Sequence, residues 1–156
     1  MATEYKEVVS VLNGLIETLK DGENGFRTAA EKAKEPALKS LFAKYASQRA
    51  EYSTELQSLV SQFGGDPATS GHVAASLHRG WMGLKEALSK DEDKALIDES
   101  ESGEDAAMKA YKEAVAQTLP PQVQTVVQKQ FGGIQEAHGV VRDLKHGVKS
   151  RATVGS

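Results

Sequence analysis

The chain contains no cysteine, only four prolines, and aromatic residues at just 6% of its 156 positions. Without cysteine it can form no disulfide, no thiolate nucleophile and no cysteine-ligated zinc or iron–sulfur site. It has no run of about 18 apolar residues, so we expect no transmembrane helix. The N-terminal residues 1–7 lack the apolar core of a signal peptide, and we therefore expect the protein to be cytoplasmic.

A strong excess of charge of either sign is also missing. Nineteen Lys and Arg residues stand against 22 Asp and Glu residues, which gives a net charge of −3. A surface that binds nucleic acid needs a basic excess, so we expect neither nucleic acid nor a membrane as a partner. The basic residues near the end of the chain are better explained by the negative end of a helix dipole; they are Arg142, Lys145, His146 and Lys149.

What the chain has is a helical pattern along most of its length. Apolar residues recur at intervals of three and four, and the prolines fall between the periodic segments. This pattern predicts four long helices at about 3–34, 36–63, 91–117 and 121–148, and a shorter one at about 70–88. Residues 150–156 are expected to form a flexible tail, which leaves one domain over residues 1–149.

The spacing also predicts which face of each helix is buried. In the first helix the apolar stripe is Val8, Leu12, Ile16, Leu19, Phe26, Ala30 and Ala33. In the second helix it is Leu38, Leu41, Tyr45, Tyr52, Leu56, Leu59 and Phe63.

The short helix at about 70–88 determines the predicted topology. At 1.5 Å per residue its roughly 17 residues would span about 25 Å, enough to carry the chain back along the bundle. The second and third long helices should therefore run parallel. We predict an all-α fold, namely a ferritin-like up-down-down-up four-helix bundle with an extra short helix in the crossover between the second and third long helices.

Polar residues interrupt the apolar stripes at one height in the predicted bundle. Glu23 occupies a core position of the first helix and Gln48 a core position of the second. Glu101 and Glu104 lie one turn apart on the inner face of the third helix, and His138 lies on that of the fourth. All are about ten to thirteen residues from the same end of the bundle. We therefore predict one polar layer, in which Glu23, Gln48, His138 and either Glu101 or Glu104 approach to direct or water-bridged contact.

Two interpretations of this layer remain open, because a buried carboxylate must be paired, protonated or bound to a cation. In the first, His138, Gln48 and tyrosines satisfy the carboxylates in a hydrogen-bonded structural layer. In the second, the layer binds iron or manganese. The metal ligands would then be Glu23, Glu101, Glu104 and His138, with Gln48, Glu51 and Gln135 beside them.

The ligand set is incomplete for a dinuclear centre. Such a centre uses a Glu-x-x-His motif on each of two helices. Residues 135–138 offer Gln-x-x-His, and residues 51–54 offer Glu-x-x-Thr without a histidine. A mononuclear or degraded metal site is therefore favoured over a working dinuclear site, and a structural layer over both.

Several segments resemble a known family. They are residues 12–17 (Leu-Asn-Gly-Leu-Ile-Glu), 20–26 (Lys-Asp-Gly-Glu-Asn-Gly-Phe), 78–82 (His-Arg-Gly-Trp-Met), 99–106 (Glu-Ser-Glu-Ser-Gly-Glu-Asp-Ala) and the surroundings of His138. Through them the chain resembles a bacterial family of uncharacterised ferritin-like four-helix-bundle proteins, a domain of unknown function. The resemblance implies the bundle fold, a stress-related role and a homodimer, but no reaction.

The incomplete ligand set sets our expectation of function. We expect a small, non-catalytic bundle with a binding or scaffolding role, which needs no cofactor. The alternative is a metal-dependent oxidase or peroxide-scavenging protein that uses the Glu and His residues of the layer. We also expect Trp81 to anchor the crossover helix on the bundle, and the glycines inside the helices, such as Gly22 and Gly25, to allow close helix packing.

Overall fold

The computed structural model describes residues 2–68 and 80–147. Within these ranges the chain forms five helices and no strand: α1 (Ala2–Lys32), α2 (Pro36–Gln62), α3 (Leu84–Ser89), α4 (Asp93–Val115) and α5 (Pro121–Lys145). The prediction of an all-α fold is confirmed. Of the crossover helix predicted at about 70–88, α3 is seen, but residues 80–83 are not helical, so the prediction is wrong for the segment that carries Trp81. Residues 69–79 and the predicted tail at 150–156 lie outside the described part of the chain.

The ends of the long helices follow from local chemistry. Pro36 and Pro121 each occupy the first turn of their helix, where the missing N–H of proline costs no hydrogen bond. The carboxylate of Asp93, at the start of α4, accepts hydrogen bonds from the backbone N–H groups of Lys34 (2.8 Å) and Glu35 (3.0 Å). This contact fixes the turn between α1 and α2 to the beginning of α4.

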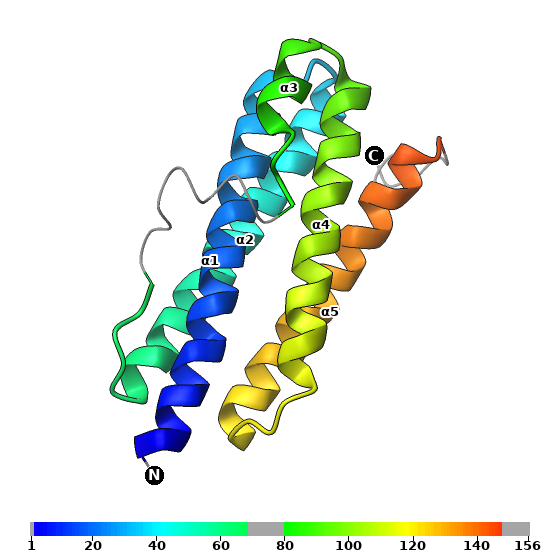
Figure 1. Cartoon of the computed structure of the whole chain (residues 1–156). Coiled ribbons are helices and arrows are strands. Elements are labelled where there is room, and N and C mark those ends of the chain that lie inside the picture. The colour runs from blue at the N-terminus through cyan, green and yellow to red at the C-terminus, as the bar shows by residue number, and fades with distance from the viewer. Residues whose placement is uncertain (1, 69–79, 148–156) are drawn as a thin grey trace.

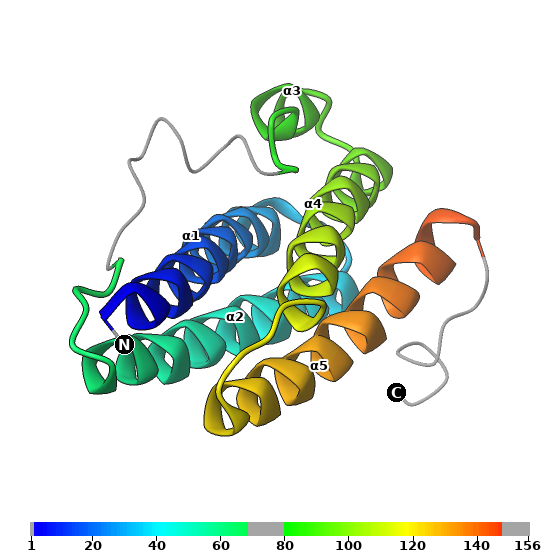
Figure 2. The ribbon, with the colours of Figure 1, turned by 60° about the horizontal axis from the view of Figure 1, so that its bottom comes forward.

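The four long helices lie side by side, and the short α3 lies outside them (Figures 1 and 2). In Figure 1, α1 and α5 run upward while α2 and α4 run downward, so α2 and α4 are parallel. Helix α1 packs against α2 along its length and also contacts α4, and α4 packs against α5. Helix α3 contacts both α4 and α1 near the upper end of the bundle.

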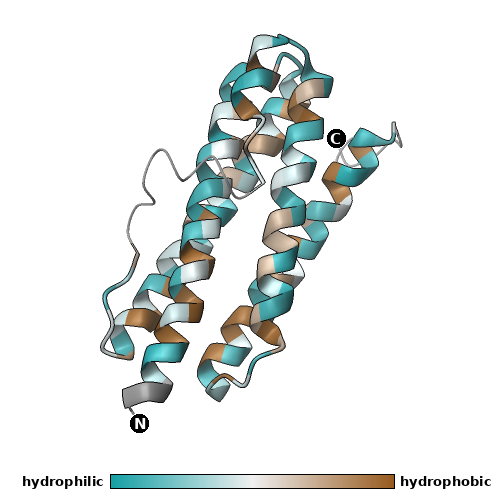
Figure 3. Ribbon diagram, in the orientation of Figure 1, coloured by the Kyte–Doolittle hydropathy of each residue, from teal (hydrophilic) through white to brown (hydrophobic). Residues whose placement is uncertain are grey.

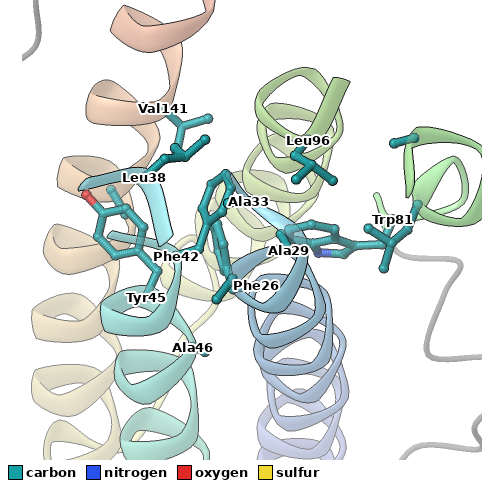
Figure 4. Close-up of a cluster of buried hydrophobic side chains, with 14 of the residues drawn as sticks. Phe26, Ala29, Ala33, Leu38, Phe42, Tyr45, Ala46, Trp81, Leu96 and Val141 are labelled. Atoms are coloured by element: carbon teal, nitrogen blue, oxygen red, sulfur yellow. The ribbon is translucent and has the colours of Figure 1, made fainter. Parts of the chain in front are cut away.

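In the orientation of Figure 1 the buried apolar side chains form an upper and a lower cluster. Figure 3 shows how apolar and polar residues alternate along the helices that carry them. The upper cluster contains most of the buried rings, from Phe26, Phe42, Tyr45 and Trp81 (Figure 4). The lower cluster is mainly aliphatic and is built on residues such as Leu12, Ile16 and Leu56. In α1, α2 and α4 the members of the two clusters are separated by residues 20–25, 47–55 and 97–106. Apart from Thr18, the buried polar residues of these three helices lie in that interval.

Candidate functional site

The centre of the polar layer is an ion pair between Arg49 of α2 and Glu104 of α4. Nη2 of Arg49 lies 2.6 Å from Oε1 of Glu104, and the two side chains are only 1% and 0% exposed. Nε of Arg49 also donates to Oε1 of Gln48, at 3.1 Å. The guanidinium carbon lies 5.2 Å from the centroid of the Phe26 ring, within the range of a cation–π contact. Glu104 is therefore neutralised by a side chain of its own chain.

Gly22 of α1 provides part of the space for this arginine. A Cβ at Gly22 would lie 3.2 Å from Nη1 and 3.5 Å from Cγ of Arg49, so a larger residue would press on the side chain. We expected this glycine to bring two helix backbones together. It instead accommodates the side chain of Arg49, which crosses from α2 to α4 against the surface of α1.

Burial and neighbouring charges act on the ionisation of this layer. Burial raises the pKa of Glu104 above its usual range, while the positive charge and hydrogen bonding of Arg49 and the nearby His138 oppose the rise. Oε2 of Glu104 has no hydrogen-bond partner among the described residues. Burial and the charge of Glu104 also raise the pKa of Tyr45 to about 12, so its hydroxyl is neutral at physiological pH.

Each of the other predicted ligands has a partner of its own: the two glutamates face basic side chains, and the histidine faces an aspartate. Glu23 lies 2.5 Å from Arg27 and 3.5 Å from Lys20, both on the same helix. Glu101 lies 2.6 Å from Lys145 of α5. Nε2 of His138, on α5, lies 2.7 Å from Oδ1 of Asp105, on α4. Within the described residues, these contacts are separate from one another.

Direct contacts among the described residues join only part of the predicted layer, and Glu23 and Glu101 have other direct partners. Only Glu104 and Gln48 are joined, and they are joined through Arg49. His138 is close enough to Glu104 for its charge to act on the carboxyl pKa, although its direct partner is Asp105. The physical reason is that each of the two outer carboxylates has a lysine or arginine within reach on an adjacent turn or helix.

The residues expected beside the ligands also differ in position. Glu51 and Gln135 are exposed, whereas Gln48 is half-buried. A Cβ at Gly133 of α5 would lie 3.2 Å from Nε2 of Gln48, so this amide faces α5. Of the three, Gln48 alone touches the buried ion pair.

Sequence reasoning missed Arg49, the residue that holds the layer together. The predicted stripe of α2 placed the polar gap at Gln48, one position away. The buried residues of α2 recur at intervals of three and four through Phe42, Tyr45, Arg49, Ser53 and Leu56, so the arginine lies on the core face. One residue corresponds to about 100° of helix rotation, which is enough to exchange an exposed side chain for a buried one. An arginine within one position of the gap is the signal that could have found it.

A second buried polar group lies lower in the bundle and was also missed. Gln130 of α5 is 1% exposed. Its Oε1 accepts a hydrogen bond from the hydroxyl of Tyr111 (2.7 Å). Its Nε2 donates to the backbone oxygen of Tyr52 (3.2 Å) and to Oε1 of Glu55 (2.8 Å). Burial raises the pKa of Tyr111, which keeps this hydroxyl protonated as a donor.

The described residues do not gather the predicted metal ligands around one point. Among residues 2–68 and 80–147, no three His, Asp or Glu side chains come close enough together to hold one. The carboxylates of Glu23, Glu101 and Glu104 each face a cationic side chain instead. Iron or manganese binding by this layer stays a prediction of the sequence.

Residues 7–117 match the model of a family described as a domain of unknown function (DUF2383), and the chain belongs to that family. The predicted membership of an uncharacterised family is thereby confirmed. The matched region includes Arg49, Trp81 and Glu104 and ends before α5. Comparison with curated proteins finds no match. None of the described helices has the length and apolar character needed to cross a membrane.

Proposed function

We propose that this protein is a ferritin-like four-helix bundle with a binding or scaffolding role in the bacterial cytoplasm and no catalytic activity of its own. The direction of the four long helices supports the ferritin-like assignment. Helices α2 and α4 are parallel, and the long connection between them contains α3, as in a bundle with one crossover.

One observation carries the non-catalytic role, namely the fully buried Arg49. In ferritin-like metal proteins, inward carboxylates from several helices are neutralised by the metal that they bind. In this chain the corresponding charge on Glu104 is neutralised by the guanidinium of Arg49, 2.6 Å away. An arginine remains charged at all physiological pH values, so it is a permanent cation at this place. The layer then serves the fold, and function belongs to the outer surface of the bundle.

The competing function is a metal-dependent oxidase or peroxide-scavenging protein. The observation in its favour is Oε2 of Glu104, which is buried, lacks a hydrogen-bond partner among the described residues and lies near His138. A cation at this oxygen would have to coexist with Arg49, because that guanidinium contacts the other carboxylate oxygen.

Metal analysis separates the two functions. The protein is produced in medium supplemented with iron or manganese, purified without chelator and analysed for bound elements. We expect substoichiometric metal and the same melting temperature with and without chelator. Stoichiometric, tightly held metal, together with a melting temperature that falls on chelation, would contradict the scaffold proposal. The variant Glu104→Gln is the control, because it removes the carboxylate and should remove any specific metal with it.

The binding role includes self-association as a homodimer, which the family resemblance suggests. Light scattering over a concentration series tests this directly. We expect a mass near twice 16.7 kDa. A mass that stays at 16.7 kDa throughout the series would remove the dimer from the proposal.

A further inference from the structure

Trp81 is buried in the bundle although it belongs to none of the five helices. Its exposed fraction is 1%, and it precedes α3 by three residues. The indole meets the Phe26 ring edge to face, with the ring centroids 5.0 Å apart and an interplanar angle of 76°. Figure 4 shows the indole pointing from the side of α3 toward Phe26 and Ala29 of α1.

The indole occupies a slot between α1 and α4 whose walls are two glycines. A Cβ at Gly25 of α1 would overlap the indole at Cδ2, and a Cβ at Gly103 of α4 would overlap it at Cε2. Both positions lie well inside long helices, where glycine is a poor helix former. The width of this slot is therefore set by the backbones of two helices.

The segment that carries Trp81 is itself attached to α4. Gly80 has a φ of +90°, which favours glycine, and a Cβ there would lie 2.6 Å from the backbone oxygen of Ser102. On the other side of Trp81, the backbone N–H of Gly83 donates to Oε2 of Glu99, at 2.8 Å. These contacts hold the backbone on both sides of Trp81 against α4. They are made by the segment before α3 and not by the walls of the slot.

We propose that the slot between Gly25 and Gly103 is a binding site for a planar aromatic ring, which this chain fills with its own Trp81. The ligand class follows from the walls. Two helix backbones leave room for a flat ring, and Phe26 adds an aromatic contact in the T-shaped arrangement that aromatic pairs favour. The ring of Phe26 also lies against the Arg49 guanidinium, so an occupant of the slot packs one residue away from the buried ion pair.

Truncation of Trp81 and addition of free indole test this site. The variant Trp81→Ala empties the slot, and because Trp81 is the only tryptophan, the emission of added indole then reports on indole alone. We expect saturable binding with one indole per chain, a blue shift of indole emission on binding, and a melting temperature that rises with indole concentration.

Two matched glycine variants identify where the indole binds. Adding Gly103→Ala to Trp81→Ala places a methyl group in the slot and should abolish saturation, although alanine is the better helix former. Adding Gly132→Ala should leave binding unchanged, because a Cβ there meets no atom within 4 Å. The proposal is overturned if Trp81→Ala folds but binds no indole, or if binding survives Gly103→Ala.

A second measurement keeps the proposal testable if Trp81→Ala does not fold. In the otherwise unchanged chain, Gly103→Ala should expel the indole, so that Trp81 emission shifts to the red and acrylamide quenches it more strongly. Gly132→Ala should leave both properties as they are in the parent protein. Emission that stays blue-shifted in the folded Gly103→Ala variant would overturn the proposal, because the glycine would then not shape the slot.

Discussion

Two of the buried polar groups of this bundle, the Arg49–Glu104 pair and Gln130, are satisfied in opposite ways. Arg49 and Glu104 form a charged pair between the two apolar clusters, and one carboxylate oxygen has no hydrogen-bond partner among the described residues. Gln130, in the lower part of the bundle, accepts from Tyr111 and donates twice, so its amide is fully used. Burial of the first group is tolerated because each charged side chain faces a partner of opposite charge. Burial of the second is tolerated because its neutral amide makes well-placed hydrogen bonds.

This difference determines what each group contributes to the fold. Removing one member of a buried ion pair leaves an uncompensated charge, which costs more free energy than an unmade neutral hydrogen bond. A buried ion pair replaced as a whole by packed apolar side chains is, by contrast, often neutral or stabilising. The pair therefore makes the fold depend strongly on each partner without adding much net stability.

The largest expected effect comes from breaking the ion pair. Arg49→Met should lower the free energy of unfolding at pH 7 by about 3–5 kcal/mol, because Glu104 is left buried and unpaired. The double variant Arg49→Met/Glu104→Met should be close to the parent protein or more stable than it by about 1–4 kcal/mol. Urea unfolding of the parent, both single variants and the double variant gives the coupling between the two residues.

Additive losses of stability in these four proteins would contradict the prediction. If the losses of Arg49→Met and Glu104→Met simply sum in the double variant, the two side chains do not stabilise one another. The single variant Glu104→Met should also lose stability, because Arg49 would then be left buried without its partner.

The second expected effect is that the stability lost in Arg49→Met depends on pH. Burial raises the pKa of Glu104, so the folded state binds its proton more tightly than the unfolded state does. Stability contributed by such a group is present at low pH and is lost as pH rises from the unfolded pKa, about 4.3, through the folded pKa. Without Arg49 the folded pKa should rise further, since the opposing positive charge is gone.

The measurement compares unfolding of the parent protein and Arg49→Met between about pH 4 and pH 8. The difference in stability should be smallest at the acid end, where Glu104 is mostly protonated in both the folded and the unfolded state, and largest at the alkaline end. Arg49→Met/Glu104→Gln is the control, and its difference from the parent should vary less with pH. A loss of the same size at every pH would show that Glu104 does not titrate in this range.

The third effect concerns the neutral group and should be smaller. Gln130→Leu leaves the hydroxyl of Tyr111 buried without an acceptor, and we expect a loss of about 1–3 kcal/mol in the free energy of unfolding. Adding Tyr111→Phe should recover part of the loss, because the stranded donor is removed. Guanidinium unfolding of the two single variants and the double variant measures this. A double variant as unstable as the sum of the singles would show that the hydroxyl and the amide act independently.

The smallest effect is expected at the outer ion pair between Glu101 and Lys145. Its lysine is well exposed, and such pairs contribute little because water and salt screen them. The pKa of Lys145 is raised by its hydrogen bond to Glu101, but Glu101→Gln should leave the urea midpoint within experimental error. A clearly lower urea midpoint for Glu101→Gln would contradict this prediction and show that Glu101 stabilises the fold as Glu104 does.

The spacing of apolar residues along the sequence was sufficient to predict most of the helices. Every residue of the predicted stripe of α1, from Val8 to Ala33, is buried. In α2 the prediction was less accurate, since Leu41 and Tyr52 are only partly buried while Phe42 is fully buried. The reason is that α2 has alanine and serine at several inner positions, so its apolar pattern does not define one face clearly.

What the sequence by itself determined is therefore the set of helices, the face that α1 buries and the presence of polar residues halfway along the bundle. These follow from residues three and four apart on one helix. The pairing of those polar residues was decided only by the tertiary structure. Arg49 reaches Glu104 across 55 positions of sequence, past Gly22, and Trp81 enters between Gly25 and Gly103. Such contacts depend on the rotation of each helix about its axis, and a difference of one residue in that rotation selects a different partner.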